Sequence, residues 1–445
     1  MTLADAFLAR GCQPDDAERR AALVARTVDG LRDTWGATPR WRWYVPGRLE
    51  VFGKHTDYGG GEVLVAAAPR GFAIAAAPRD DGRLRVVDVP NRVTLELDAE
   101  DAGPPRTGWT SYLQVTRRRL AANFPGAPLG LDVAFASDLP RAAGMSSSSA
   151  LVTAIASALI ARGDLAARSE WQHGVRTPED HATYLGCIEN GADFGALRGT
   201  SGVGTHGGSE DHTAILLSEA QHVGHFRFVP TARLARVPVP AGWTFVVATS
   251  GVHADKAGSV RDRFNRAAFG VRALLALWNG AAAMPATSLA AALAVPDAEA
   301  RLRHLAAAAT PMGWTAEALS RRLDHFLAEN AVVRDAVEAV RRADAAALGA
   351  LAVVSQRHAE DALGNQVPET AALAAVAREC GAHGATSFGA GFGGGVWALV
   401  DHGDVDGFAR AWTAAYRQRC PHVTNVAVVP VRPGPGVLAL PADAR

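Results

Sequence analysis

Three glycine-rich segments, each joined to an apolar stretch, constrain this chain more than any other feature of its sequence. They occupy residues 47–61, 139–150 and 387–395. Glycine allows tight turns and lets the backbone come close to a ligand or to another part of the chain. We therefore expect these segments to sit at turns between strands and helices, and we examine each for the chemistry that its side chains allow.

Length and composition narrow the class of protein. A chain of 445 residues exceeds what one hydrophobic core usually supports, so two domains are expected. The 45 cationic and 45 acidic residues balance, which argues against nucleic acid or an anionic membrane as a partner. No apolar run is long enough to span a membrane and no secretory signal is visible, so a cytoplasmic location is expected. The four widely spaced cysteines fit reduced thiols.

Hydrophobic periodicity predicts both helices and strands along the chain. Helices are predicted over residues 1–35, 109–121, 151–161 and 405–419, with several Ala-rich helices between 257 and 352. Strands are predicted over 41–52, 63–68, 72–77, 84–89, 131–136, 213–217, 225–229, 243–249, 396–400 and 423–431, with 72–77 and 84–89 expected to pair. A cluster of prolines at 230–240 predicts a domain change there, giving domains 1–235 and 236–445.

The first glycine-rich segment gathers charged side chains around one turn. Arg48, Lys54, His55 and Asp57 all lie within ten residues of one another. Such a turn is expensive to bury without partners, so it is either solvated or holds a polar ligand. An ordinary charged hairpin is the alternative, and the residues alone leave both interpretations open.

The second segment runs from Gly144 through four consecutive serines into an apolar helix. The N-terminus of a helix exposes free N–H groups and the positive end of the helix dipole, which together suit a phosphate. Serine hydroxyls there can cap the helix or hold a cation bound to that phosphate. Simple capping is the alternative, although four serines exceed what a cap needs.

Two further segments give weaker signals. The glycines at 387–395 fit either close approach to a ligand or tight packing. His206, Glu210 and His212 invite a metal site, but the glycines around them provide no helical register that would bring the side chains together. Asp211, placed just before the predicted strand 213–217, is better suited to act as a base or an ion-pair partner.

Taken in order, these segments resemble the motifs of the GHMP small-molecule kinase family, in its galactokinase branch. The first, GRLEVFGKHTDYGGGEVL, resembles the signature G-R-x-N-x-x-G-E-H-T-D-Y-x-G-G-x-x-L. The next two, PRAAGMSSSSALV and GTHGGSEDH, resemble P-x-x-x-G-L-S-S-S-A and G-x-x-G-G-x-M-D-Q. SFGAGFGGGVWAL resembles the third glycine-rich motif, and WTSYL matches a W-x-N-Y-V helix. The resemblance spans roughly residues 40–430.

The resemblance implies an α+β, two-domain GHMP kinase fold with the active site in the cleft between the domains. It implies an ATP-dependent 1-kinase that phosphorylates the anomeric hydroxyl of a galactose-like hexose, with ATP and Mg²⁺ as cofactors. No nucleic acid or membrane partner is expected, and the protein is expected to be a monomer or a weak homo-oligomer. Matching positions give these roles: Asp211 as base and Arg48 as stabilising cation; Lys54, His55, Asp57 and Gly208 for the sugar; Trp109, Gly144, Ser146, Ser147 and Ser148 for ATP; Ser148 and Glu189 for Mg²⁺.

Departures from the motifs bear on the substrate. Lys54 stands where galactokinases carry a glutamate that contacts the C6 hydroxyl of the sugar, so an acidic sugar such as galacturonate is one hypothesis. The alternative is that Lys54 points away and pairs with Asp57 or Glu50, which leaves plain galactose as the substrate. The chain has one other lysine, Lys256, in a segment where alignment on His253 places Val260 at a sugar-contacting tyrosine.

A non-catalytic sugar sensor with the same fold is the alternative from another class of protein. The presence of Arg48, Asp211 and the uninterrupted serine run favours an enzyme.

Overall fold

A large mixed sheet forms the first half of the fold. The computed structural model describes residues 2–101, 103–141, 143–252, 259–309 and 311–441. The strand order is β12-β1-β2-β5-β3-β4, with β6 pairing β2 and β7; only β3 and β5 are parallel among the described pairs. The strands are β1 (Trp41–Phe52), β2 (Glu62–Pro78), β3 (Leu84–Asp88), β4 (Val93–Leu97), β5 (Leu131–Ser137), β6 (His222–Arg227), β7 (Ala232–Pro238) and β12 (Leu438–Ala439).

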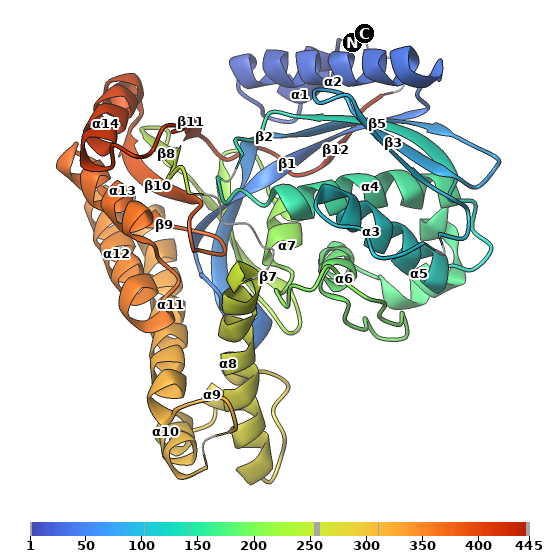
Figure 1. The fold of residues 1–445 in the computed structure, drawn as a ribbon. Helices are drawn as coiled ribbons and strands as arrows, with labels where there is room; N and C mark the ends of the chain where they lie inside the picture. The colour runs from blue at the N-terminus through green and yellow to red at the C-terminus, as the bar shows by residue number, and fades with distance from the viewer. Residues whose placement is uncertain (1, 102, 142, 253–258, 310, 442–445) are drawn as a thin grey trace.

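Helices cover both faces of this sheet (Figure 1). One face carries α2, whose apolar stripe of Val24, Val28 and Leu31 is buried. The opposite face carries α3 and α4. The helices of this half are α1 (Leu3–Leu8), α2 (Pro14–Trp35), α3 (Trp109–Asn123), α4 (Ser147–Gly163), α5 (Ser169–Gly174), α6 (Pro178–Asn190) and α7 (Glu210–Leu217), with short turns η1 (Asp57–Gly59) and η2 (Leu165–Ala167).

A smaller antiparallel sheet, in the order β11-β8-β10-β9, forms the second half. Its strands are β8 (Trp243–Thr249), β9 (Gly384–Ser387), β10 (Gly395–Asp401) and β11 (Val428–Val431). The helices and short helical turns of this half are α8 (Ser259–Ala281), α9 (Leu289–Leu293), α10 (Ala298–Ala308), α11 (Ala316–Arg341), α12 (Ala345–His358), the π-helix η3 (Ala359–Leu363), α13 (Pro368–Glu379), the turn η4 (His402–Asp404) and α14 (Val405–Arg419). Among the described residues, no helix is long and apolar enough to cross a membrane.

One hydrophobic cluster joins the two sheets. It contains Leu49 and Phe52 of β1 together with Phe245 of β8 and Trp397 of β10. The rings of Phe52 and Phe245 pack edge-on against Trp397, at centroid distances of 5.5 and 5.3 Å. The indole Nε1 of Trp397 also donates to the carbonyl oxygen of Val51 at 3.1 Å. The two halves therefore share a core.

Several predicted elements differ from the structure. Residues 63–68 and 72–77 belong to the single long strand β2, and β5 lies between β2 and β3, so the expected hairpin does not form. The predicted strand 213–217 is part of helix α7, because a short apolar run has no period that separates helix from strand. Within the predicted strand 423–431, only Val428–Val431 is a strand. The chain end returns to the first sheet as β12, while the boundary between the predicted domains stays a prediction.

Candidate active site

The glycine-rich segments meet in the folded chain. Arg48 on β1 donates from Nη1 to the carbonyl oxygen of Gly144 at 3.0 Å, which joins the first segment to the second. The Nε2 of His55 lies 3.2 Å from the carbonyl oxygen of Ala390, which joins the first to the third. Residues separated by hundreds of positions in sequence thus surround one site, as the motif order predicted.

Among the described residues, each of these three segments holds one non-glycine residue in the left-handed region of backbone space. The φ angles are 57° for His55, 57° for Ser146 and 60° for Phe392. Such a conformation costs about 1–3 kcal/mol and persists where the surroundings impose it, which is common at functional sites. The coincidence of three such residues in the three motifs points to a built site.

Tight packing explains part of the glycine content of the third segment. A Cβ atom on Gly395 would lie 2.4 Å from the carbonyl oxygen of Ala143, and one on Gly389 would lie 3.1 Å from that of Gly144. The third segment therefore rests directly on the loop before α4. Of the two interpretations left open by the sequence, close packing accounts for these two glycines.

Arg48 and Asp211 form a buried ion pair at the start of α7. The Nε and Nη2 atoms of Arg48 lie 2.7 and 2.5 Å from Oδ1 of Asp211. The guanidinium is buried, whereas the Asp211 side chain keeps 23% of its surface exposed. Although burial opposes the charge of Arg48, the carboxylates of Asp211, Glu210 and Glu50 raise its pKa above the ordinary value. A reachable carboxylate held by a permanent cation is suited to accept a proton from a substrate.

Contacts that the motifs did not reveal place Glu189 close to Asp211. Ser149 Oγ donates to Oε2 of Glu189 at 2.8 Å and lies 3.3 Å from Oδ2 of Asp211. His212 Nε2 is 3.2 Å from the same Glu189 oxygen, although it is not aligned for a hydrogen bond. Sequence reasoning missed Ser149, whose only signal was a fourth serine where the family motif has alanine.

The start of α4 presents polar groups suited to a phosphate. Ser146 precedes the helix, and its buried hydroxyl finds no hydrogen-bond partner among the described residues. The first N–H groups of a helix are likewise free for an anion. Trp109, at the start of the neighbouring helix α3, is half-buried, and its ring centroid is 5.4 Å from that of Phe135.

The side-chain oxygen atoms near the start of α4 fit a Mg²⁺ ion that is also bound to a phosphate. Ser148 lies in the first turn of α4, next to Ser149 and its contact to Glu189. A hydroxyl and a carboxylate are oxygen ligands that Mg²⁺ accepts, usually together with substrate phosphates. Within the described ranges, no group of three His, Cys, Asp or Glu side chains could hold a metal by itself. The protein residues present therefore fit a metal that phosphate oxygens help to bind.

Asp57 and Gly208 are packed against each other beside α7. Oδ2 of Asp57 accepts a hydrogen bond from the backbone N–H of Glu210 at 3.1 Å, and a Cβ on Gly208 would lie 2.3 Å from that oxygen. Only glycine fits at position 208 without displacing the carboxylate. Burial raises the pKa of Asp57 to about 6.

An aromatic side chain from α8 faces His55. The ring centroid of Phe264 lies 5.3 Å from that of His55, and His55 Nδ1 is 2.9 Å from the Tyr58 hydroxyl. Phe264 lies one helical turn beyond Val260 on α8, and the expectation that Val260 replaces a sugar-contacting tyrosine stays a prediction. The other lysine, Lys256, lies outside the described residues, as does His253.

The structure places Lys54 away from the partners expected for it. Its side chain is 1% exposed, and its Nζ donates to Ser355 Oγ and, at 3.0 Å, to Thr386 Oγ1. Oε1 of Glu329 lies 3.9 Å from the ammonium. Lys54 therefore points into the second half of the fold and pairs with Glu329 rather than with Asp57 or Glu50, while its part in sugar recognition stays a prediction.

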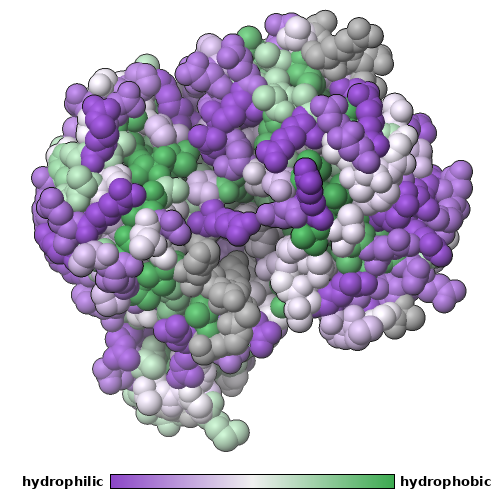
Figure 2. Space-filling model, turned by 45° about the horizontal axis from the view of Figure 1, so that its top comes forward, coloured by the Kyte–Doolittle hydropathy of each residue, from purple (hydrophilic) through white to green (hydrophobic). Residues whose placement is uncertain are grey.

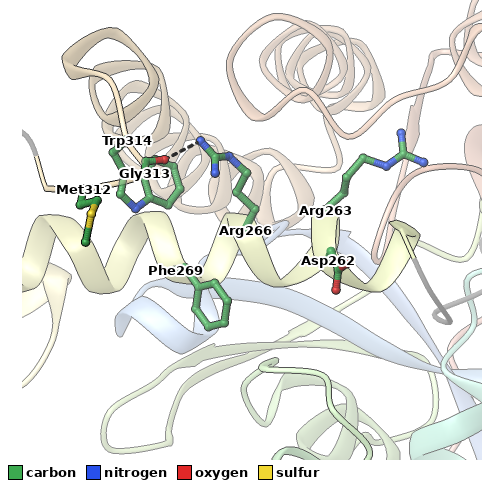
Figure 3. Close-up of a pocket in the computed structure, with 7 residues that line it drawn as sticks. All are labelled: Asp262, Arg263, Arg266, Phe269, Met312, Gly313 and Trp314. Carbon is green, nitrogen blue, oxygen red and sulfur yellow. Dashed lines mark hydrogen bonds between the residues drawn. The ribbon is translucent and has the colours of Figure 1, made fainter.

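The surface is hollowed in more than one place. In the space-filling view, hydrophilic side chains gather beside a hollow between the two parts of the molecule (Figure 2). A second hollow, of about 430 Å³, lies between α8 and residues 312–314 (Figure 3). There the guanidinium of Arg266 lies 4.3 Å from the ring centroid of Trp314 and donates to the carbonyl oxygen of Gly313 at 3.1 Å. The second hollow contains none of the predicted site residues.

Comparison with known families matches three parts of the chain. Residues 31–78 match the galactokinase galactose-binding signature, residues 111–170 the GHMP kinase N-terminal domain, and residues 336–418 the GHMP kinase C-terminal domain. Each of these ranges contains one of the three glycine-rich segments, and the second match includes the start of α4.

Whole-length relatives agree with these matches. The galactokinase of Streptomyces coelicolor is 30% identical over 88% of this chain and 93% of its own length. The galactokinase of Chloroflexus aggregans is 29% identical over 84% and 87%. The crystal structure of Lactococcus lactis galactokinase with galactose superposes with a TM-score of 0.77 over 94% of this chain and 99% of that one, at 22% identity. The mevalonate kinase of L. major superposes with a TM-score of 0.53 over 88% and 96%, at 17% identity.

Proposed function

Because the chain belongs to the galactokinase branch of the GHMP kinase family, and is therefore an ATP-dependent sugar kinase, we propose that it phosphorylates the anomeric hydroxyl of galactose or a closely similar neutral hexose. The observation that carries the proposal is the Arg48–Asp211 pair, which lies beside the start of α4. Base, cation and phosphate-binding helix are the parts that phosphoryl transfer to a hydroxyl requires.

In this mechanism Asp211 accepts the proton of the attacking hydroxyl. Arg48 holds the Asp211 carboxylate in place and stabilises negative charge on the phosphoryl group in transit. Gly144, Ser146 and Ser147 bind the ATP phosphates at the N-terminus of α4, and Trp109 packs near the nucleotide. When bound, Mg²⁺ neutralises phosphate charge, and Ser148 and Glu189 are the residues that would hold it.

The sugar is oriented by residues of the first segment and of the loop before α7. His55 and Asp57 supply polar atoms for ring hydroxyls, and Gly208 leaves room beside the Asp57 carboxylate. The Lactococcus lactis relative was crystallised with galactose, which supports a hexose of this kind. The acidic-sugar hypothesis loses its main support, because the Lys54 ammonium is buried among Ser355, Thr386 and Glu329.

A substrate panel tests the proposed sugar. We expect ATP-dependent phosphorylation of galactose at C1, weaker turnover of N-acetylgalactosamine, and little turnover of galacturonate or glucuronate. A preference for either uronate over galactose would overturn the neutral-hexose proposal.

The Asp211→Asn variant separates a kinase from a sugar sensor. Loss of the base should lower kcat by about 10²–10⁴-fold, while ATP affinity measured by calorimetry stays close to that of the wild type. Unchanged kcat in this variant would remove Asp211 from the mechanism. A wild-type protein that binds sugar and ATP without turnover would favour the sensor.

A further inference from the structure

Two buried glutamates lie against the same Nε and Nη2 atoms of Arg48 that contact Asp211. Glu50 on β1 is 2% exposed and Glu210 on α7 is 5% exposed. Glu50 Oε2 lies 3.8 Å from Nη2 of Arg48, and Glu210 Oε1 lies 3.6 Å from Nε. The side chains of Glu50 and Glu210 also form a hydrogen bond with each other.

Both glutamates are departures from the galactokinase motifs. The signature of the first segment has asparagine at the position of Glu50, and the G-x-x-G-G-x-M-D-Q motif has methionine at that of Glu210. These two positions are separated by 160 residues in sequence, yet the fold brings them into contact. Two new acids that meet each other and the same arginine are best explained by a joint role.

The hydrogen bond between two carboxyl groups requires a proton. Two ionised carboxylates offer only acceptors, so one member of the pair must be the neutral acid. Burial raises the pKa of Glu50, and burial together with the charge of Glu50 raises the pKa of Glu210 well above its ordinary value. Glu210 therefore holds the proton, and Glu50 is the carboxylate, which also accepts the backbone N–H of Gly389 at 3.3 Å.

We propose that Glu50 and Glu210 form a carboxylic acid–carboxylate pair that positions Arg48 for the proposed kinase reaction. With one shared proton, the pair presents a single negative charge to Arg48, enough to hold the guanidinium without drawing it away from Asp211. Two ionised carboxylates would compete with Asp211 for the Nε and Nη2 atoms of Arg48, and two neutral groups would leave the guanidinium to the charge of Asp211. The other charged groups facing the pair are Lys54, Asp57, Asp211 and Glu329.

Single substitutions test the charge state that the proposal assigns. Glu210→Gln replaces the neutral acid by a neutral amide that can still donate to Glu50, so kcat at neutral pH should stay within about threefold of the wild type. Glu50→Gln removes the charge, and kcat should fall about 10–100-fold with little change in the KM for galactose, the size typical of residues that orient a functional group. Rates should also decline at alkaline pH in the wild type, as Glu210 ionises, and this decline should be absent in Glu210→Gln.

The family residues provide a rescue test. Glu210→Met leaves the Glu50 carboxylate without its hydrogen bond, and Glu50→Asn leaves Glu210 free to ionise beside Arg48, so each should lower kcat. The double variant Glu50→Asn/Glu210→Met restores the combination of the family motifs and should recover kcat relative to either single variant. Asp132→Asn, a buried carboxyl paired with Arg85 far from these motifs, is the control that should leave the pH profile unchanged.

A readout without turnover separates this proposal from the proposed function. Infrared spectra of the ligand-free protein at neutral pH should contain a protonated carboxyl band that disappears in Glu210→Gln, with thermal melts confirming that the variant is folded. Absence of that band, or additive losses of kcat in the double variant, would overturn the proposed acid–carboxylate pair. If the band is present but no sugar is phosphorylated, the kinase proposal fails instead.

Discussion

Lys54 is a cation held inside the protein by side chains from three elements: Glu329 of α11, Ser355 of α12 and Thr386 of β9. The same Glu329 carboxylate accepts the backbone N–H of Gly53 at 3.0 Å. A buried ion pair contributes little net stability, but removal of one partner leaves an uncompensated charge. Lys54 therefore anchors the first glycine-rich segment to the second half of the fold.

Replacing Lys54 by methionine should destabilise the protein and leave its sugar preference unchanged. We expect a loss of about 3–5 kcal/mol in the free energy of unfolding, because Glu329 stays buried without its cation. Urea denaturation measures the loss, and Lys54→Met/Glu329→Gln should recover part of it. Arg341→Met, which removes an exposed pair with Glu338, is the control and should cost less than about 1 kcal/mol. A changed ratio of galactose to galacturonate turnover would show instead that Lys54 takes part in sugar recognition.

The buried carboxyl of Asp57 should make sugar use depend on pH. Its pKa is raised from 3.8 to about 6 by burial, so the folded protein binds the proton more tightly than the unfolded chain does. This group's contribution to the free energy of unfolding therefore falls as pH rises from about 4 to about 6. Activity should move the other way, because an ionised Asp57 is the better acceptor for sugar hydroxyls.

We expect kcat/KM for galactose to fall as the pH is lowered through about 6, where Asp57 takes up its proton. Asp57→Asn should lower kcat/KM at neutral pH and flatten this acid limb. Steady-state rates between pH 5 and 8 check both expectations, with calorimetric binding of ATP as the control. An acid limb that persists in Asp57→Asn would assign it to another group.

At the scale of elements, the third glycine-rich segment packs on the loop before α4, where the phosphate site is proposed. Gly395→Ala would force a Cβ to within 2.4 Å of the Ala143 carbonyl oxygen, so one backbone must move. We expect a loss of about 1–3 kcal/mol, together with a raised KM for ATP. Gly407→Ala on α14 meets no atom within 4 Å and is the control, expected to be neutral or stabilising. Urea denaturation measures the loss of stability, and ATP titration measures the change in KM. An unchanged KM for ATP would show that the third segment has no part in nucleotide binding.

At the same scale, some elements could be predicted from the sequence and others could not. The bounds of β1, β8 and α14 could be predicted because long apolar patterns and their flanking turns are local. Helix α7 could not, since its apolar residues form a short run without a clear period. The placement of β5 between β2 and β3 depends on long-range pairing that no local pattern records.

The candidate site likewise has contacts that the sequence predicted and contacts that it did not. The motifs predicted the contact between Arg48 and Asp211, because they specify a shared backbone arrangement. The direction of Lys54 could not be predicted, since its partner Glu329 lies 275 residues away on a helix without a motif. The contact between Glu50 and Glu210 was hidden for the same reason, although both departures were visible in the sequence.

At the scale of the whole molecule, the two sheets are joined by a core. Trp397 is fully buried between β1 and β8, and its indole N–H donates across the junction to Val51. Trp412 is buried as deeply, but its cluster contains only residues from 246 to 423, and its indole N–H donates to Leu373. The chain end adds a second link, because β12 pairs with β1. A shared core and a returning strand couple the halves energetically.

The described protein should therefore unfold in one calorimetric transition, even when only the second half is weakened. Trp412→Ala should cost about 3–5 kcal/mol. With an unfolding entropy of about 2 cal/mol/K per residue, this loss lowers the Tm of a chain of this length by about 3–5 °C. Because the halves share the cluster around Trp397, the whole transition should shift, with calorimetric and van't Hoff enthalpies still in agreement. Trp397→Ala, which weakens the junction, is the matched variant in which two transitions should separate. Two transitions in the wild type, with Trp412→Ala moving only one, would show instead that the halves fold independently and meet as separate domains.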